Sequence, residues 1–266
     1  MAHARSAAPN PSGSWTSLDG VCHIDVVHNE GYSAREYYRG EVAANYTDHR
    51  VRSAAAALKW QRESDAAQVL LDDVPKGARV LDLPCGDGRF ADALERLGVE
   101  WVGADISIDM MLAGRGRHAS MERAQALIQS DGEALPFRDG TFDFVLCARF
   151  ANLVPLPVLQ SVLTELRRVT RSFLILEVRV ERDTSWASPA RRARRIASRL
   201  RARLTGQQDG VERSTIARDP LRVHHEAAFR SVVRDAGWVE RQRVEVVTSR
   251  WPLRPDPLYF VRLDAS

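Results

Sequence analysis

The sequence contains only two lysines, Lys59 and Lys76, among its 38 basic residues, so arginine supplies nearly all of its positive charge. It has three cysteines, Cys22, Cys85 and Cys147, which form neither a metal-type pair nor an even set for disulfides. We therefore predict no metal site and a reduced, cytoplasmic protein. No apolar run approaches the ~20 residues that a membrane-spanning helix needs, so we predict no transmembrane segment.

The first 32 residues also lack hydrophobic periodicity and the continuous apolar core of a signal peptide. We expect residues 1–32 to form a flexible N-terminal arm, followed by one domain over residues 33–266. Residues 181–219 interrupt this domain as an insertion, in which the segment Arg191–Arg203 carries seven arginines and no acid. Its apolar spacing predicts an amphipathic helix. The arginine face is either simply solvated, or a lid over the substrate, or a patch for an anionic partner.

The rest of the chain alternates short apolar strands with amphipathic helices, which is typical of a doubly wound parallel sheet. Strands are expected at 80–83, 100–104, 126–129, 142–147, 173–178, 239–247 and 258–263. The main helices are expected at 33–46, 53–71, 89–97, 107–113, 156–169 and 224–236. The loop between the last two strands is too short for a crossover helix, so these strands should pair antiparallel. We predict an α/β fold with a Rossmann-like, doubly wound, seven-stranded, mostly parallel sheet and a C-terminal antiparallel hairpin.

The stretch Val80–Phe90 joins a strand, a glycine turn and a helix start, the arrangement of a nucleotide-type pocket. Gly86 and Gly88 belong to a G-x-G-x-x-A pattern, which dinucleotide-binding enzymes also show. Asp87 lies inside this turn, where we expect it to cap free N–H groups at the start of the helix. A carboxylate there would repel a pyrophosphate. This position therefore favours a cofactor that has no phosphates and carries a cation.

Three acids, Asp82, Asp105 and Asp131, stand at the ends of three expected strands, 23 and 26 residues apart. This is about one strand–helix unit each time, and the carboxyl ends of the strands are where such sheets bind ligands. Asp105 is placed to accept hydrogen bonds from both ribose hydroxyls, whether the cofactor is a dinucleotide or one without phosphates. Asp131, which precedes Gly132, is placed to accept a hydrogen bond from the exocyclic amine of adenine.

Four segments together resemble the successive motifs of class I S-adenosylmethionine-dependent methyltransferases: Val80–Phe90, Gly103–Ser107, Asp131–Phe137 and Phe142–Cys147. The similarity is greatest to the small-molecule type that includes the quinone-biosynthesis methyltransferases. It covers roughly residues 33–263, apart from the insertion. It implies S-adenosyl-L-methionine as cofactor and methyl transfer to a small-molecule or lipid-linked acceptor.

The resemblance also implies roles for single residues. Asp82 would support the turn or reach the methionine amino group, Ile106 would lie against the adenine, and the segment from Cys147 to Arg149 would line the methionine end. The implied cofactor-binding residues are Asp82, Cys85, Gly86, Gly88, Asp105, Ile106, Asp131, Gly132, Cys147 and Arg149. Two positions depart from the family pattern: Pro84 replaces the first glycine of the turn, and Asn152 stands where many relatives have a histidine.

No residue of the sequence is clearly a catalytic base. The candidates are Tyr38, His224 and His225, with Glu226 beside the histidines, although such a histidine pair is more often a surface or helix-capping feature. Other functions stay open: an RNA or protein methyltransferase that uses the arginine segment, a NAD(P)-dependent oxidoreductase, or a binder without catalysis. No nucleic-acid-binding module and no Tyr-x-x-x-Lys pair is present in the sequence.

Overall fold

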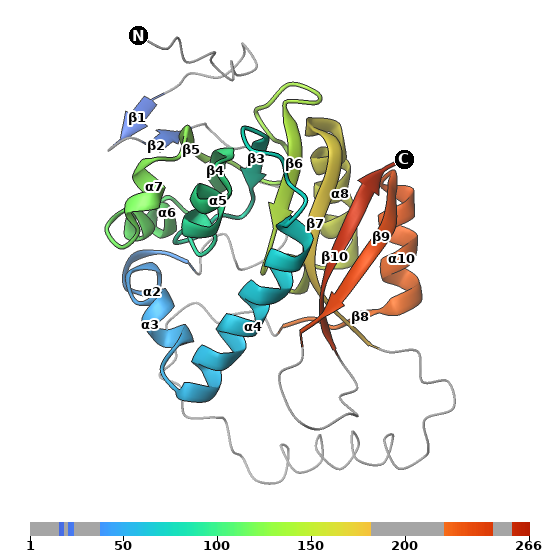
Figure 1. The fold of residues 1–266 in the computed structure, drawn as a ribbon, viewed down its shortest axis with the longest axis horizontal. Coiled ribbons are helices and arrows are strands. Elements are labelled where there is room, and N and C mark those ends of the chain that lie inside the picture. Colours follow the sequence, from blue (N-terminus) through green and yellow to red (C-terminus); the bar gives the residue numbers. More distant parts are fainter. Residues whose placement is uncertain (1–15, 19–20, 24–37, 182–220, 247–256) are drawn as a thin grey trace.

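In the computed structural model, the apolar side chains of the strands pack beneath helices on both faces of one sheet. Figure 1 shows the sheet with these helices around it. The structure describes residues 16–18, 21–23, 38–181, 221–246 and 257–266. Val80 packs into the core beneath helices α4 (Ala54–Leu71) and α5 (Ala91–Leu97), whereas its neighbour Leu81 packs into the core beneath α8 (Leu156–Val169) and α10 (Glu226–Asp235). This two-sided burial explains why the strands read as nearly continuous apolar runs.

The seven predicted strands form a contiguous run in the order β5-β4-β3-β6-β7-β10-β9. Their bounds are β3 Arg79–Asp82, β4 Glu100–Asp105, β5 Ala126–Gln129, β6 Phe142–Cys147, β7 Thr170–Glu181, β9 Trp238–Glu245 and β10 Leu258–Ala265. The first five pair in parallel, and β10 pairs antiparallel with both β7 and β9. The predicted mostly parallel sheet with a terminal antiparallel hairpin is therefore confirmed.

The described chain has three strands beyond the predicted seven, which gives a sheet of ten strands. Strands β1 (Thr16–Leu18) and β2 (Val21–His23) pair antiparallel with each other, and β2 joins β5 in parallel. Both lie within the expected N-terminal arm, where three-residue strands leave no periodicity to read. The short β8 (His224–His225) pairs with the end of β7. β2 and β8 each pair with a strand that is distant in the sequence, which no local pattern indicates, and β1 pairs with its neighbour β2.

Most predicted helices are found, and the differences lie at their ends. The helix predicted over 53–71 is α4, and Ser53 caps it by accepting a hydrogen bond from the Ala56 N–H. The helix predicted over 33–46 is found in part: α2 (Gly40–Ala44) ends at Asn45, and a second short helix, α3 (Tyr46–Arg50), follows it. Residues 33–37 of that prediction lie outside the described residues. The helix expected from 224 begins only at Glu226, because the two preceding histidines are extended in β8.

The remaining helices surround the expected ligand site. They are α6 (Ile108–Arg115), α7 (Ala119–Glu122) and the short 3-10 helix η1 (Ala151–Leu153). The predicted insertion shares only Glu181, the last residue of β7, with the described residues. The Arg191–Arg203 segment and its predicted helix lie outside them. No helix among the described residues is long and apolar enough to cross a membrane.

Candidate functional site

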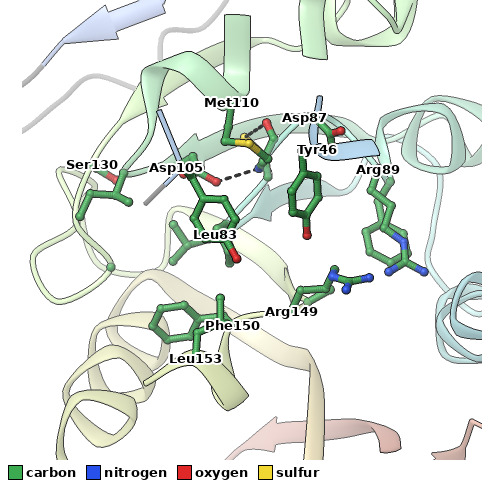
Figure 2. Close-up of a pocket in the computed structure, with 18 of the residues that line it drawn as sticks. Tyr46, Leu83, Asp87, Arg89, Asp105, Met110, Ser130, Arg149, Phe150 and Leu153 are labelled. Atoms are coloured by element: carbon green, nitrogen blue, oxygen red, sulfur yellow. Dashed lines mark hydrogen bonds between the residues drawn. The ribbon is translucent and has the colours of Figure 1, made fainter. Parts of the chain in front are cut away.

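A cleft opens at the carboxyl ends of the parallel strands, next to the glycine turn (Figure 2). It is lined by Tyr38, Tyr46, Trp60, Leu83, Pro84, Cys85, Gly86, Asp87, Arg89, Phe90, Asp105, Ile106, Met110, Ser130, Gly132, Ala148, Arg149, Phe150 and Leu153. Six of the ten predicted cofactor-binding residues are among them: Cys85, Gly86, Asp105, Ile106, Gly132 and Arg149. Asp82, Gly88, Asp131 and Cys147 are not.

The glycine turn is built so that Asp105 can face the cleft. Gly86 has a φ of 54°, in the left-handed region that favours glycine, and its N–H donates to Asp105 Oδ2 at 2.8 Å. The Ser107 N–H donates to the other carboxylate oxygen at 2.8 Å. Burial raises the pKa of Asp105 to about 6, against the lowering effect of these two hydrogen bonds. The strand end thus presents a fixed acceptor that titrates near neutral pH.

Asp82 is a buried carboxylate at the end of β3, with only 1% of its surface exposed. Neither of its side-chain oxygens has a hydrogen-bond partner among the described residues. Burial raises its pKa well above the usual range, and the negative charge of Asp105 adds to this. The adjoining Leu83–Pro84 peptide is cis, and both of those residues line the cleft. A buried acceptor left unpaired is costly, and Asp82 lies next to the lining residue Leu83 without lining the cleft itself.

Asp87 does not cap the following helix as the sequence suggested. Its carboxylate accepts a hydrogen bond from the Thr47 hydroxyl on α3, and Arg117 Nη1 lies 4.0 Å away. The helix itself begins later, at Ala91 of α5. Asp87 is therefore an attachment point for residues 38–50, which we call the strap.

Other contacts fasten the strap beside the cleft. The Ser107 hydroxyl donates to the carbonyl of Tyr38, the Gly40 N–H donates to Asp109 at 2.7 Å, and Arg117 donates to the carbonyl of Ala44. The strap carries Tyr38 and Tyr46 into the lining of the cleft. Sequence reasoning gave Tyr38 but missed Tyr46 as a site residue.

At the far end of the cleft, Ser130 and Gly132 line the wall, and the predicted site residue Asp131 between them does not. Asp131 is buried, accepts a hydrogen bond from the Glu133 N–H at 3.1 Å, and does not line the cleft. Its neighbours Ser130 and Gly132 do, and the Ser130 hydroxyl is buried without a partner among the described residues. Ser130 follows β5 directly, which is the signal that could have identified it.

The opposite end of the cleft contains a charged cluster that the sequence did not predict as a unit. Arg149, Arg89 and Trp60 line the cleft there, and Glu63 of α4 is buried behind them. Glu63 pairs with both arginines, which belong to segments 26 and 86 residues away. Burial raises the pKa of Glu63, but the attraction of Arg149, Arg89 and Lys59 outweighs it and lowers the pKa overall.

The structure brings neither candidate histidine into the lining of the cleft. The His224 side chain is buried, its Nε2 lies 2.7 Å from the carbonyl oxygen of Ala151, and burial lowers its pKa. His225 is exposed. Glu226 pairs with Arg230 and Arg243. Tyr38 is thus the one predicted candidate base that lines the cleft.

Asn152 and the buried cysteines have structural environments. The Asn152 amide donates to the carbonyls of Arg179 and Arg222 and accepts from the Arg179 N–H, so it fixes η1 to β7. Burial raises the pKa of the Cys85 and Cys147 thiols, which makes both poor nucleophiles.

Comparisons with known proteins agree with this geometry. A family model described as "Methyltransferase domain" matches residues 80–172. A demethylmenaquinone methyltransferase of Thermus thermophilus is 36% identical over 111 residues, which are 41% of this chain and 49% of that protein. The chain thus spans about half the length of the curated relatives it matches, or less.

Solved structures show the same fold at lower identity. The magnesium protoporphyrin IX methyltransferase of Synechocystis PCC 6803, solved with bound SAH, has a TM-score of 0.59 and 16% identity, covering 87% of this chain and 98% of its own. A geranyl diphosphate C-methyltransferase of Streptomyces coelicolor A3(2) has a TM-score of 0.53 and 14% identity, covering 77% and 76%. Residues 80–172 thus carry a methyltransferase domain, and the predicted resemblance of this chain to the class I S-adenosylmethionine-dependent methyltransferases, the quinone methyltransferases among them, is confirmed.

Proposed function

We propose that the chain transfers a methyl group from S-adenosyl-L-methionine to a small-molecule acceptor bound in the same cleft. The observation that carries this proposal is the pair of acids at adjacent strand ends. Asp105 faces the cleft as a fixed acceptor, and Asp82 is buried with both oxygens unpaired among the described residues. Together they suit a ligand with a vicinal diol and an ammonium group.

The residues present fit this donor better than a dinucleotide. Asp105 would accept from the ribose hydroxyls, Asp82 would receive the methionine ammonium, and Ile106 with Ser130 would enclose the adenine. A pyrophosphate at the glycine turn would instead meet the buried carboxylate of Asp87 and that of Asp82. When bound, the donor supplies a methyl group on a sulfonium, which an acceptor nucleophile displaces directly.

The chain's own contribution to this reaction is mainly positioning. Holding two reactants in near-attack geometry can supply about 7–11 kcal/mol in favourable systems. The strap and η1 enclose the cleft from two sides, through Tyr38 and Tyr46 on one and Phe150 and Leu153 on the other. Tyr38 is the candidate to take a proton from the acceptor.

The acceptor side favours a small, partly aromatic molecule. Trp60, Tyr46 and Phe150 provide aromatic walls for such an acceptor. Relatives and neighbours named for a quinone precursor and a porphyrin support a small-molecule acceptor.

Calorimetric titration tests the proposal. The 266-residue chain should bind S-adenosylhomocysteine and S-adenosylmethionine, and Asp105→Ala should weaken both by about 1–3 kcal/mol because paired polar groups are left unmatched. The matched control is Asp143→Ala, which removes an acid at the amino end of β6, away from the strand ends that line the cleft. Binding of NADH without binding of S-adenosylhomocysteine or S-adenosylmethionine would refute the proposal.

A further inference from the structure

Three cations share one carboxylate at one end of the cleft. The Glu63 carboxylate receives Arg89 Nη1 at 2.8 Å, Arg149 Nη1 at 3.2 Å and Lys59 Nζ at 3.3 Å. The side chains of Glu63 and Arg89 are 1% and 5% exposed, and that of Arg149 is 17% exposed. Most of this positive charge is therefore removed from water with a single close counter-ion.

Glu177 of β7 adds a second acid near this cluster. Its negative charge raises the pKa of both Arg89 and Arg149, and the pKa of Arg149 is raised overall in spite of its burial. The Nε atoms of Arg89 and Arg149 are nevertheless buried and have no hydrogen-bond partner among the described residues. The two guanidinium groups therefore keep hydrogen-bond donors that suit an anion.

The cluster is held ready for such an anion. Trp60 lies beneath both guanidinium groups, whose carbon atoms are 4.1 Å (Arg89) and 5.6 Å (Arg149) from its ring centroid. Arg149 is the one non-glycine residue with a positive φ, 60°, in the described chain, a strain that persists where surrounding structure imposes it. In Figure 2, Arg149, Arg89 and Tyr46 lie together at the end of the cleft opposite Ser130.

The geometry points to a carboxylate on the methyl acceptor, which we propose is an aromatic carboxylic acid anchored by Arg149. A planar guanidinium matches a carboxylate with two parallel hydrogen bonds, and Trp60, Tyr46 and Phe150 supply faces for an aromatic ring. The anchored carboxylate is not the methylated group, because hydrogen bonds from Arg149 withdraw the charge that a nucleophile needs. This inference rests on the proposed function and adds the chemical class of the acceptor.

Calorimetry on the donor-loaded protein tests the inference. The chain is saturated with S-adenosylhomocysteine and titrated with benzoate, 4-hydroxybenzoate and 2-naphthoate, each beside its neutral carboxamide. At least one acid should bind about tenfold more tightly than its carboxamide. Arg149→Met should abolish this preference, whereas the control Arg171→Met, at the amino end of β7, should retain it.

Donor binding shows whether Arg149 holds the carboxylate of the acceptor or the carboxylate of the methyl donor. The family resemblance placed Arg149 at the methionine end of the donor, whereas this inference places it at the acceptor. Arg149→Met should therefore bind S-adenosylhomocysteine and 5′-methylthioadenosine, which lacks the methionine carboxylate, as the unchanged protein does. Loss of the first with retention of the second would show that Arg149 holds the donor, and would overturn the inference. Equal binding of every acid and its carboxamide would also overturn it.

A second variant keeps the inference testable if Arg149→Met does not fold. Arg149→Lys keeps the charge but not the planar fork, so it should keep donor binding and lose part of the preference for acids. An undiminished preference in this variant would contradict the role of the fork. Failure of the proposed function is distinct, because the unchanged protein would then not bind S-adenosylhomocysteine at all.

Discussion

Replacing Asp82 by asparagine should make the ligand-free protein more stable and its donor binding weaker. Asp82 is buried, its two oxygens have no hydrogen-bond partner among the described residues, and burial together with Asp105 raises its pKa. The carboxylate is thus a cost to the fold that a bound ammonium group would remove. Asparagine occupies nearly the same volume without the charge.

The size and the pH dependence of this effect follow from the structure. Each unit by which folding raises the pKa of an acid costs about 1.4 kcal/mol of stability at a pH above both pKa values. Because the folded-state pKa of Asp82 lies above its unfolded value, ionisation of Asp82 destabilises the fold progressively as pH rises above the unfolded pKa. Asp82→Asn should therefore gain about 1–2 kcal/mol in the free energy of unfolding at pH 8, or roughly 2–4 °C per kcal/mol in Tm, and almost nothing near pH 4.

Urea unfolding at pH 8 and pH 4 and calorimetric titration with S-adenosylhomocysteine measure the two effects. Donor affinity of Asp82→Asn should fall about 10- to 150-fold, equivalent to a charge-assisted hydrogen bond of 1.5–3 kcal/mol. Asp143→Asn is the matched control, because Asp143 is paired with the Arg79 N–H and Arg171 and should not gain stability. A less stable Asp82→Asn protein with unchanged donor affinity would refute the reasoning.

Three further changes test the rest of the site. Because the pKa of Asp105 is about 6, the affinity for S-adenosylhomocysteine should fall as pH drops from 7.5 to 5. Asp105→Asn should bind more weakly at pH 8, and its affinity should not depend on pH in this way. An equal pH dependence of affinity in the two proteins would contradict the assignment. Gly88→Ala should lower the free energy of unfolding in urea by about 2–4 kcal/mol, because Gly88 has a φ of 83° and the added Cβ would lie 2.5 Å from the Met121 sulfur. The control Gly98→Ala, at a φ of 69° without such an overlap, should lower it by only about 1–2 kcal/mol. Asn152→Ala should lower the free energy of unfolding by about 1–3 kcal/mol and leave calorimetric donor binding intact; a loss of binding at full stability would place Asn152 in the site.

Local sequence pattern predicted the elements that depend on near neighbours in the chain. Gly86 and Gly88 fall in the turn because only glycine adopts a positive φ readily, and both do so. Asp105 was placed correctly at the end of a buried strand and faces the cleft. The prediction failed where a distant partner decided the outcome: β7 draws His224 into an extended pair, and Thr47 with Arg117 takes Asp87 away from the helix it was expected to cap.

The sequence by itself determined the seven predicted strands, the glycine turn and the spacing of Asp82 and Asp105, because apolar runs buried on both faces are separated by amphipathic helices. Only the tertiary structure decided which charges meet. Trp60, Glu63, Arg89 and Arg149 come from three segments and touch at one end of the cleft. Their attraction and their desolvation depend on distance and burial, which no linear pattern encodes. The strand ends that the proposed donor would use were therefore readable from the chain, and the charged cluster became visible only in the fold.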